Sequence, residues 1–330
     1  MKSYKVLSLF DGISVGRLAL QRASIPVSQY FASEIDKHAI TVSKNNWPEI
    51  IQIGDVRQVN GADYSNVDLL IGGSACQSFS NAGKREGFDG KSGIFWEFVR
   101  VLKECKPRFF LLENVVMKKE WAAIISEALG VEYVEINSSL VSAQHRRRYY
   151  WFGQIKDGVT TQIPIPQPED KKIMLTDVID QDYDGIWVWP RGANPGGVQN
   201  YKGKSPSVTT SSWQHNFYIY RDHGKEPVFS KSGLKELGYI NSNYKTNRVY
   251  SSEGKCPCLN AASGGVSGPG NALIMVKDKV RKFTIEEAET LQTLPHGYTK
   301  GISLTQRFKC LGNGWTCDVI AHILKQLPNV

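Results

Sequence analysis

The sequence predicts an α/β fold in which a doubly wound, mostly parallel sheet carries a smaller, loop-rich domain that contains β-structure. From residue 5 to about 152, strand-like apolar runs alternate with amphipathic stretches, the pattern of parallel strands connected by helices. Between about 155 and 278 the composition shifts to Gly, Pro, Ser, Asn and Tyr, without helical periodicity. We therefore expect an α/β domain at 1–154, a loop-rich domain at 155–278 and a segment at 279–330 that returns to the first domain.

Each predicted element has its own local signal. The first strand, at 6–10, runs into a turn that contains Gly12 and Gly16, and an amphipathic helix follows at 17–23. After the loop-rich region, Thr284 and Glu287 form a capping box that opens a helix to about Leu294. A further helix is expected at 318–327, which is apolar at helical spacing. The remaining strands are expected at 30–33, 50–53, 67–71, 109–112, 131–136 and 149–152.

Composition limits the classes of function. The chain has 330 residues, of which 41% are hydrophobic, enough for one large core and an appended domain. A formal net charge of +8 favours a polyanionic partner. No apolar run has the length of a membrane span, and the first residues do not resemble a signal peptide, so we expect a cytoplasmic protein with no membrane partner. Six cysteines without paired spacing favour neither disulfides nor a metal site.

The turn after the first strand is a candidate cofactor site. Glycines there let a ligand approach the backbone and the amino terminus of the following helix. Glu34 comes 18 residues after Gly16, where a doubly wound fold places a carboxylate on ribose hydroxyls, and Asp55 follows the third strand, where it would meet an adenine amino group. The three-glycine dinucleotide fingerprint is absent, which argues against NAD or FAD. A plain tight turn remains the alternative.

Three further polar features lie at the ends of strands of the same predicted sheet. Cys76 comes after the run at 67–71 and two glycines, and Glu113 comes after the run at 109–112. Arg146 and Arg148 lie two residues apart before the next strand, so both side chains are expected on one side. The carboxyl ends of parallel strands share one edge of a sheet, so these groups form one plausible site. Taken singly, each has a structural alternative: an inert buried thiol, a helix cap, or a solvated basic face.

Together these features resemble the cytosine-5 DNA methyltransferase family. The segment 10–16 resembles the family's first motif, in which Phe10 would pack on S-adenosylmethionine, and Gln144, Arg146 and Arg148 match a Gln-x-Arg-x-Arg motif. Gly312-Asn313-Gly314-Trp315 resembles the last motif, which completes the same pocket, and its tryptophan is most similar to the eukaryotic de novo enzymes. The resemblance covers 5–152 and 280–325 and implies a class I methyltransferase, Rossmann-like fold. The cofactor residues it implies are Phe10, Asp11, Gly12, Gly16, Glu34, Ile35, Asp55, Val56, Asn313, Gly314 and Trp315.

The resemblance also implies a mechanism. Carbon 5 of cytosine is a poor nucleophile, so the Cys76 thiolate would first add to carbon 6. Glu113 would relieve the charge at N3, and the arginines would stabilise charge at the cytosine carbonyl. The catalytic set is Cys76, Glu113, Gln144, Arg146 and Arg148.

The expected partner is double-stranded DNA, bound by a monomer in a bacterial or phage-infected cell, with modification in a restriction-modification system as the role. The base must leave the stack before both ring carbons can be reached. The basic loop at 78–92, with Ser80, Lys84 and Arg85, resembles the family's loop that closes on DNA, although a flexible surface loop has the same composition. The domain at 155–278, including Gly264 and Gly265, resembles the variable target-recognition region.

Three other functions remain open at the level of sequence. An RNA cytosine-5 methyltransferase would share the framework, but the substantial recognition region favours duplex DNA. Ala75 stands where the family normally has proline, which leaves room for a catalytically silent DNA-binding paralogue. A bulkier group from a modified sulfonium cofactor would need the same residues. The target DNA sequence does not follow from these motifs.

Overall fold

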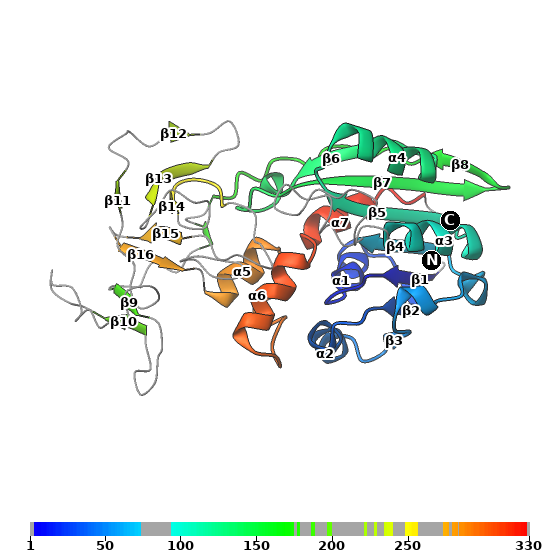
Figure 1. Cartoon of the computed structure of the whole chain (residues 1–330), viewed down its shortest axis with the longest axis horizontal. Helices are drawn as coiled ribbons and strands as arrows, with labels where there is room; N and C mark the ends of the chain where they lie inside the picture. Colours follow the sequence, from blue (N-terminus) through cyan, green and yellow to red (C-terminus); the bar gives the residue numbers. More distant parts are fainter. Residues whose placement is uncertain are drawn as a thin grey trace.

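A computed structural model shows the architecture of the chain (Figure 1). The first domain is described apart from residues 1–2 and 74–93, the C-terminal segment almost throughout, and the loop-rich region in short pieces. The described residues are 3–73, 94–174, 177–178, 186–188, 197–199, 221–222, 228–229, 234–239, 248–256, 273–276, 279–282 and 284–328.

The first domain is built on an eight-stranded sheet in the order β3-β2-β1-β4-β5-β7-β6, with β8 paired to β7. The first five strands of this order are parallel, and β7 is antiparallel to all three of its neighbours. The chain leaves β1 toward β2 on one side and returns to β4 on the other, which creates a switch point at the β1/β4 boundary. The predicted α/β fold with a mostly parallel sheet is confirmed. The strands are β1 (Tyr4–Leu9), β2 (Val27–Ser33), β3 (Ile51–Gln52), β4 (Leu69–Gly73), β5 (Phe109–Val115), β6 (Tyr133–Asn137), β7 (Arg147–Lys156) and β8 (Val159–Gln162).

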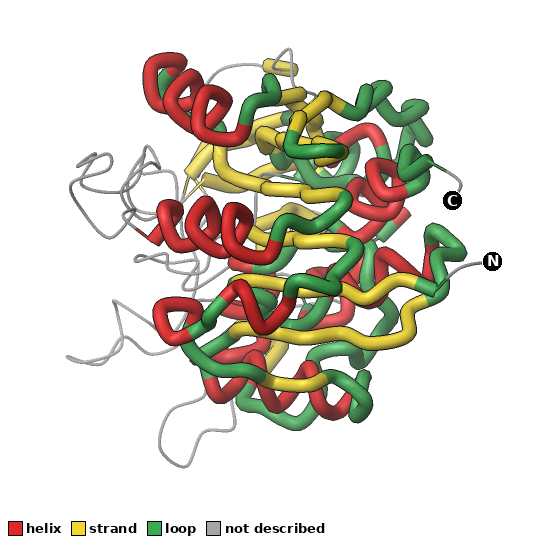
Figure 2. The backbone as a smooth tube through the Cα atoms, turned by 90° about the vertical axis from the view of Figure 1, so that its right-hand side faces the viewer, coloured by secondary structure: helices red, strands yellow, loops and turns green. Residues whose placement is uncertain are grey.

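Helices cover both faces of this sheet (Figure 2). One apolar cluster joins the sheet to α1, α2, α5, α6 and α7, and a second joins the opposite face to α3 and α4. The central strands are therefore buried on both sides, and Phe109 to Leu112 of β5 have no exposed surface. Burial on both faces explains why these strands read as continuous apolar runs rather than alternating ones. The helices are α1 (Val15–Arg22), α2 (Lys37–Asn46), α3 (Phe95–Cys105), α4 (Lys119–Leu129), α5 (Ile285–Leu291), α6 (Leu304–Asn313) and α7 (Cys317–Leu324).

The C-terminal helices α5, α6 and α7 pack against the eight-stranded sheet. Helix α7 contributes Val319, Ile320 and Ile323 to the same apolar cluster as α1. Arg22 at the end of α1 forms an ion pair of 2.7 Å with Asp318 at the start of α7. The capping box at Thr284 is present, with Glu287 as its reciprocal partner.

Several elements differ in extent from their expected ranges. Glu113 lies inside β5 rather than after it, because β5 continues to Val115 by pairing with β7. β8 extends the first sheet beyond residue 154, since its residues pair with Gly153 to Lys156. In the rest of the chain, short strands form a second sheet in the order β11-β13-β14-β15-β16, with β12 paired to β13, and a separate β9-β10 pair. These strands are β9 (Ile186–Val188), β10 (Gly197–Gln199), β11 (Arg221–Asp222), β12 (Val228–Phe229), β13 (Lys235–Tyr239), β14 (Arg248–Ser251), β15 (Leu273–Val276) and β16 (Lys279–Lys282).

Candidate active site at the carboxyl ends of the strands

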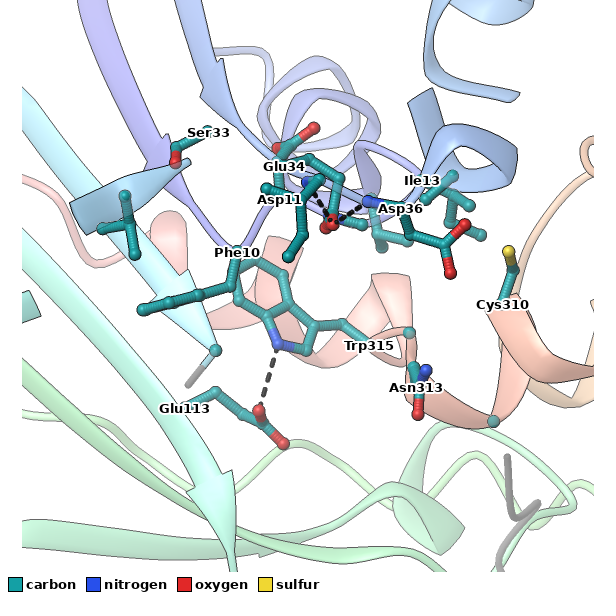
Figure 3. A pocket seen from close by; sticks show the side chains of 18 of the residues that line it. Phe10, Asp11, Ile13, Ser33, Glu34, Asp36, Glu113, Cys310, Asn313 and Trp315 are labelled. Atoms are coloured by element: carbon teal, nitrogen blue, oxygen red, sulfur yellow. Dashed lines mark hydrogen bonds between the residues drawn. The ribbon is translucent and has the colours of Figure 1, made fainter. Parts of the chain in front are cut away.

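A cavity of about 320 Å³ lies at the carboxyl ends of β1, β2, β4 and β5. Figure 3 shows its walls, with the turn after β1 on one side and Glu113, Asn313 and Trp315 on the other. The location is the switch-point edge at which open α/β sheets bind ligands. Its lining includes Phe10, Asp11, Gly12, Ile13, Ser33, Glu34, Ile35, Asp36, Asp55, Val56, Gly73, Ile94, Glu113, Asn114, Arg146, Arg148, Cys310, Asn313, Gly314 and Trp315.

The turn between β1 and α1 has an unusual backbone. Phe10, Gly12 and Ser14 all have positive φ, at 57°, 60° and 59°. Positive φ is unfavourable for residues with a side chain, so the turn needs fixed partners. The Asp11 amide donates to the Ser33 carbonyl at 3.1 Å, and the Ser14 hydroxyl bonds to Ser43 at 2.6 Å and to Asp11. The turn is thereby held against β2 and α2.

Glu34 joins the two loops at the end of the cavity that the turn after β1 forms. Its Oε2 accepts a hydrogen bond from the Gly12 amide at 2.8 Å. Its Oε1 accepts from the amides of Ile35 at 2.7 Å and Asp36 at 2.8 Å. A carboxylate offers about four acceptor sites, so Glu34 retains capacity to accept a ligand hydroxyl. Ile35 is 67% exposed at the rim of the cavity, although it is a large apolar side chain.

Asp11 is a carboxyl of this wall with a raised pKa. Burial raises the pKa of its carboxyl to about 6, against hydrogen bonds from Ser14 and Tyr30 that favour the anion. The Tyr30 hydroxyl donates to Asp11 Oδ1 at 2.8 Å. The nearby Glu34 charge raises the pKa further. Asp11 is therefore an anion near neutral pH whose charge is only partly compensated, and a cationic ligand would stabilise it.

Asp55 lines the cavity but is engaged locally. Its carboxylate accepts two hydrogen bonds from Arg57 Nε, at 3.1 and 3.0 Å, and one from the Arg57 amide at 3.0 Å. The Arg57 side chain lowers the pKa of Asp55 below its ordinary value. Asp36 is similarly occupied, because it caps α2 through the His38 amide and pairs with Lys309 at 2.7 Å.

Glu113 lies at the opposite end of the cavity, where it is 7% exposed. Its Oε1 is 3.1 Å from Arg148 Nε, and its Oε2 accepts a hydrogen bond from Trp315 Nε1 at 3.1 Å. β-Pairing explains the arrangement: Glu113 is the register partner of Gly73 on β4, while Val115 is opposite Arg148 on β7. Two donors from distant parts of the chain thus fix both oxygens of one carboxylate.

The two arginines of the sequence motif both line the cavity but have different partners. Arg146 is 3% exposed and donates to the Gly314 carbonyl at 2.8 Å and to the Gly312 carbonyl at 3.3 Å. It therefore holds the end of α6 against the cavity. Arg148 contacts Glu113 instead.

Gln144 does not reach the cavity. It has no exposed surface, and its side-chain amide donates to the Leu291 carbonyl at 3.0 Å and to Gln292 Oε1 at 3.3 Å. These contacts tie the segment before β7 to the end of α5. Gly16 does not line the cavity either; a side chain at Gly16 would meet Ile71, Tyr30 and Trp315, so it permits close packing behind the wall.

The remaining residues of the predicted site fall outside the described part of the chain. β4 ends at Gly73, three positions before Cys76 in the sequence. Outside the described residues lie Ala75, Cys76, Ser80, Lys84, Arg85, Gly264 and Gly265.

The structure also adds cavity residues that the sequence reasoning missed. Ser33 and Asp36 flank Glu34 and Ile35 in the sequence. Their position at and just after the end of β2 could therefore have indicated that they line the cavity. Cys310 lies on α6, and burial raises the pKa of its thiol to about 12. No local sequence pattern marks Cys310, because it reaches the cavity only through the packing of the C-terminal segment. Among the described residues, no helix is long and apolar enough to cross a membrane, and no group of three potential metal ligands occurs.

The family profile and the curated relatives that match this chain are all methyltransferases. The profile of the C-5 cytosine-specific DNA methylases matches residues 4–329. The chain is 28% identical to the type II methyltransferase M1.ScrFI of Lactococcus lactis subsp. cremoris, over 99% of this chain and 78% of the relative. It is 25% identical to the type II methyltransferase M.NlaX of Neisseria lactamica, over 98% and 96% of the two chains.

Solved structures share the fold. A prophage-encoded DNA modification methyltransferase of E. coli superposes with a TM-score of 0.59 at 21% identity, covering 98% of each chain. A Spodoptera frugiperda DNMT2 variant superposes with a TM-score of 0.64 at 18% identity, covering 98% of this chain and 99% of that one.

Proposed function

The chain belongs to the C-5 cytosine-specific DNA methylase family and is a DNA cytosine-5 methyltransferase, and we propose that its cavity binds S-adenosylmethionine beside an extruded cytosine of double-stranded DNA. One observation carries this proposal. The side chains of Asp11 and Glu34 lie on one side of the cavity, and that of Glu113 lies on the other (Figure 3). A single space is thus lined by groups suited to a cationic nucleoside and by a group suited to a heterocyclic base.

The cofactor wall fits S-adenosylmethionine by its chemistry. Asp11 supplies a half-buried anion for the positively charged end of the ligand, and Glu34 has acceptor capacity for ribose hydroxyls. Phe10, Ile35 and Val56 offer apolar surface beside these carboxyls. When bound, the cofactor supplies an electrophilic methyl group on a sulfonium. The volume of this cavity, about 320 Å³, lies within the range that is usual for small-molecule sites.

The chemistry on the base is assigned to Cys76 and Glu113. The Cys76 thiolate adds to carbon 6, forming a C–S bond and making carbon 5 nucleophilic. Glu113 holds the proton at N3 that balances the charge placed on the ring, and Arg148 and Trp315 keep its carboxyl oriented. After carbon 5 has gained its methyl group, its proton leaves to solvent and the C–S bond breaks, which restores the thiolate; the N3 proton then leaves the ring, and the aromatic base is restored.

We assign Arg146 a supporting role, because its guanidinium bonds to the Gly312 and Gly314 carbonyls. We place Gln144 further back, as a brace between the motif and α5. The region 155–278 would supply the contacts that select the DNA sequence, with the enzyme acting as a cytoplasmic monomer. Relatives that are type II methyltransferases favour a role in DNA modification.

The test combines methyl transfer with covalent trapping. The purified protein is incubated with S-adenosylmethionine carrying a labelled methyl group and with duplex DNA, and bisulfite sequencing locates the modified cytosines. The mapped target is then made with 5-fluorocytosine, in which loss of the carbon 5 proton is blocked. A denaturation-resistant adduct on the Cys76 peptide is expected.

Cys310→Ala is the matched control, since Cys310 lines the cavity but its raised pKa, about 12, keeps it a thiol. This variant should still trap the DNA, and Cys76→Ala should not. Trapping that persists in Cys76→Ala would exclude Cys76 as the nucleophile. Label that appears on RNA and not on DNA would contradict the duplex-DNA substrate.

A further inference from the structure

Trp315 lies between the two halves of the cavity (Figure 3). It lines the cavity together with Phe10 and Ile13 of the cofactor wall. Its Nε1 donates to Glu113 Oε2 at 3.1 Å, on the base side. The two residues are 202 positions apart in the sequence, so this contact exists only because the C-terminal segment packs on the first domain.

Two glycines leave room for the indole ring of Trp315. A Cβ at Gly73 would lie 2.6 Å from Trp315 Nε1 and 3.0 Å from Glu113 Oε2. A Cβ at Gly16 would lie 3.3 Å from Trp315 Cζ3. The ring therefore packs directly on the backbone at the end of β4 and at the start of α1. A side chain at Gly73 would collide with the indole N–H, and one at Gly16 would press on the ring, so close packing at these two positions limits the direction of the N–H.

The glycine contact also places Trp315 at the strand end that leads to the nucleophile. Gly73 is the last residue of β4 and the register partner of Glu113 on β5. The indole spans these two neighbouring strand ends. A displacement of the ring would reach the Glu113 carboxyl through the hydrogen bond and the backbone of β4 through packing.

We propose that Trp315 is a positioning residue for Glu113: its indole N–H orients the carboxyl that acts on the base, while the face of the same ring forms part of the cofactor wall. This inference rests on the function proposed above. It implies that a cofactor pressed against the indole stiffens the catalytic carboxyl, so that the two halves of the cavity are coupled through one side chain. Arg148, on the other oxygen of Glu113, then completes the orientation.

Trp315→Phe separates these two roles, because it keeps an aromatic face and removes the N–H. We expect the dissociation constant of S-adenosylmethionine, measured by calorimetry, to change by less than about threefold. The single-turnover rate on the mapped DNA target should fall by about tenfold or more, as for the loss of a hydrogen bond to a charged group. Trp96→Phe is the matched control: Trp96 is 42% exposed and does not line the cavity, and its replacement should leave both quantities unchanged.

A second experiment detects the hydrogen bond between Trp315 and Glu113 directly. In protein labelled with ¹⁵N-tryptophan, the indole resonance that disappears in Trp315→Phe identifies Trp315 among the eight tryptophans. Glu113→Gln should shift this resonance more than any other. Adding Trp315→Phe to Glu113→Gln should slow single-turnover methylation by less than about twofold further, since contacting residues that act together are not additive.

Gly73→Ala provides an independent route if Trp315→Phe does not fold, because the added methyl group would displace the indole. It should shift the same resonance and slow methylation with cofactor affinity retained. The proposal is overturned if Trp315→Phe, or Gly73→Ala in its place, methylates at the wild-type rate, or loses rate only in proportion to cofactor affinity. An inactive wild type, or trapping that survives Cys76→Ala, would instead refute the proposed function, and the resonance shift would still report on the contact.

Discussion

The pKa of Asp11 predicts a pH dependence of cofactor binding. Burial raises the pKa of this carboxyl to about 6, so the anion appears only as the pH rises through that value. A cationic ligand binds the anion and releases the proton. Affinity for S-adenosylmethionine should therefore rise between pH 5 and 7 and then level off. The α-amino group of S-adenosylmethionine stays protonated in this range, since α-amino groups have pKa values of about 8.

The magnitude follows from the fraction of Asp11 that is ionised. With a pKa of about 6, roughly one tenth of the protein carries the Asp11 anion at pH 5, and almost all of it does at pH 7.5. If only the anionic form binds, the dissociation constant should be about tenfold weaker at pH 5 than at the plateau.

Isothermal titration calorimetry at constant ionic strength measures this profile directly. Asp11→Asn should bind more weakly at pH 7.5 and lose the dependence on pH. Asp55→Asn is the matched control, because Asp55 lines the same cavity but Arg57 holds its pKa below the ordinary value. It should keep the wild-type profile. A flat wild-type profile, or an unchanged slope in Asp11→Asn, would refute the reasoning.

Four further predictions address other parts of the molecule. Glu113→Gln should lower turnover by about 100-fold or more in single-turnover assays and leave cofactor affinity nearly unchanged; equal turnover would remove its assigned role. Ala75→Pro should change the single-turnover rate only a few-fold, since proline would restrict the backbone without adding a catalytic atom; a silent wild type rescued by proline would show that Ala75 inactivates. Tyr298→Phe removes a hydroxyl that donates to the Ile13 carbonyl at 3.0 Å, so it should lower the melting temperature and weaken cofactor binding together. Transplanting 155–278 into a related methyltransferase should transfer target specificity, as read by bisulfite sequencing; an active chimera that keeps the host's target would contradict the assignment.

Much of the fold was predictable from local patterns. Buried parallel strands need continuous apolar runs, and this made β1, β4 and β5 visible with errors of at most three residues at either end. The capping box at Thr284 is equally local, because both of its hydrogen bonds join residues three positions apart. Glu34 and Glu113 line the same cavity because a sheet brings the carboxyl-end parts of its parallel strands to one edge.

The tertiary structure decided which of these residues act together. The motif placed Gln144 with Arg146 and Arg148, but packing against α5 takes Gln144 away from the cavity and gives the two arginines different partners. The bond between Trp315 and Glu113 has no sequence signal either. Residue type and spacing determine a strand or a cap, because their hydrogen bonds are local. A contact between distant segments depends on how whole elements pack, and on two glycines that leave room for a single indole ring.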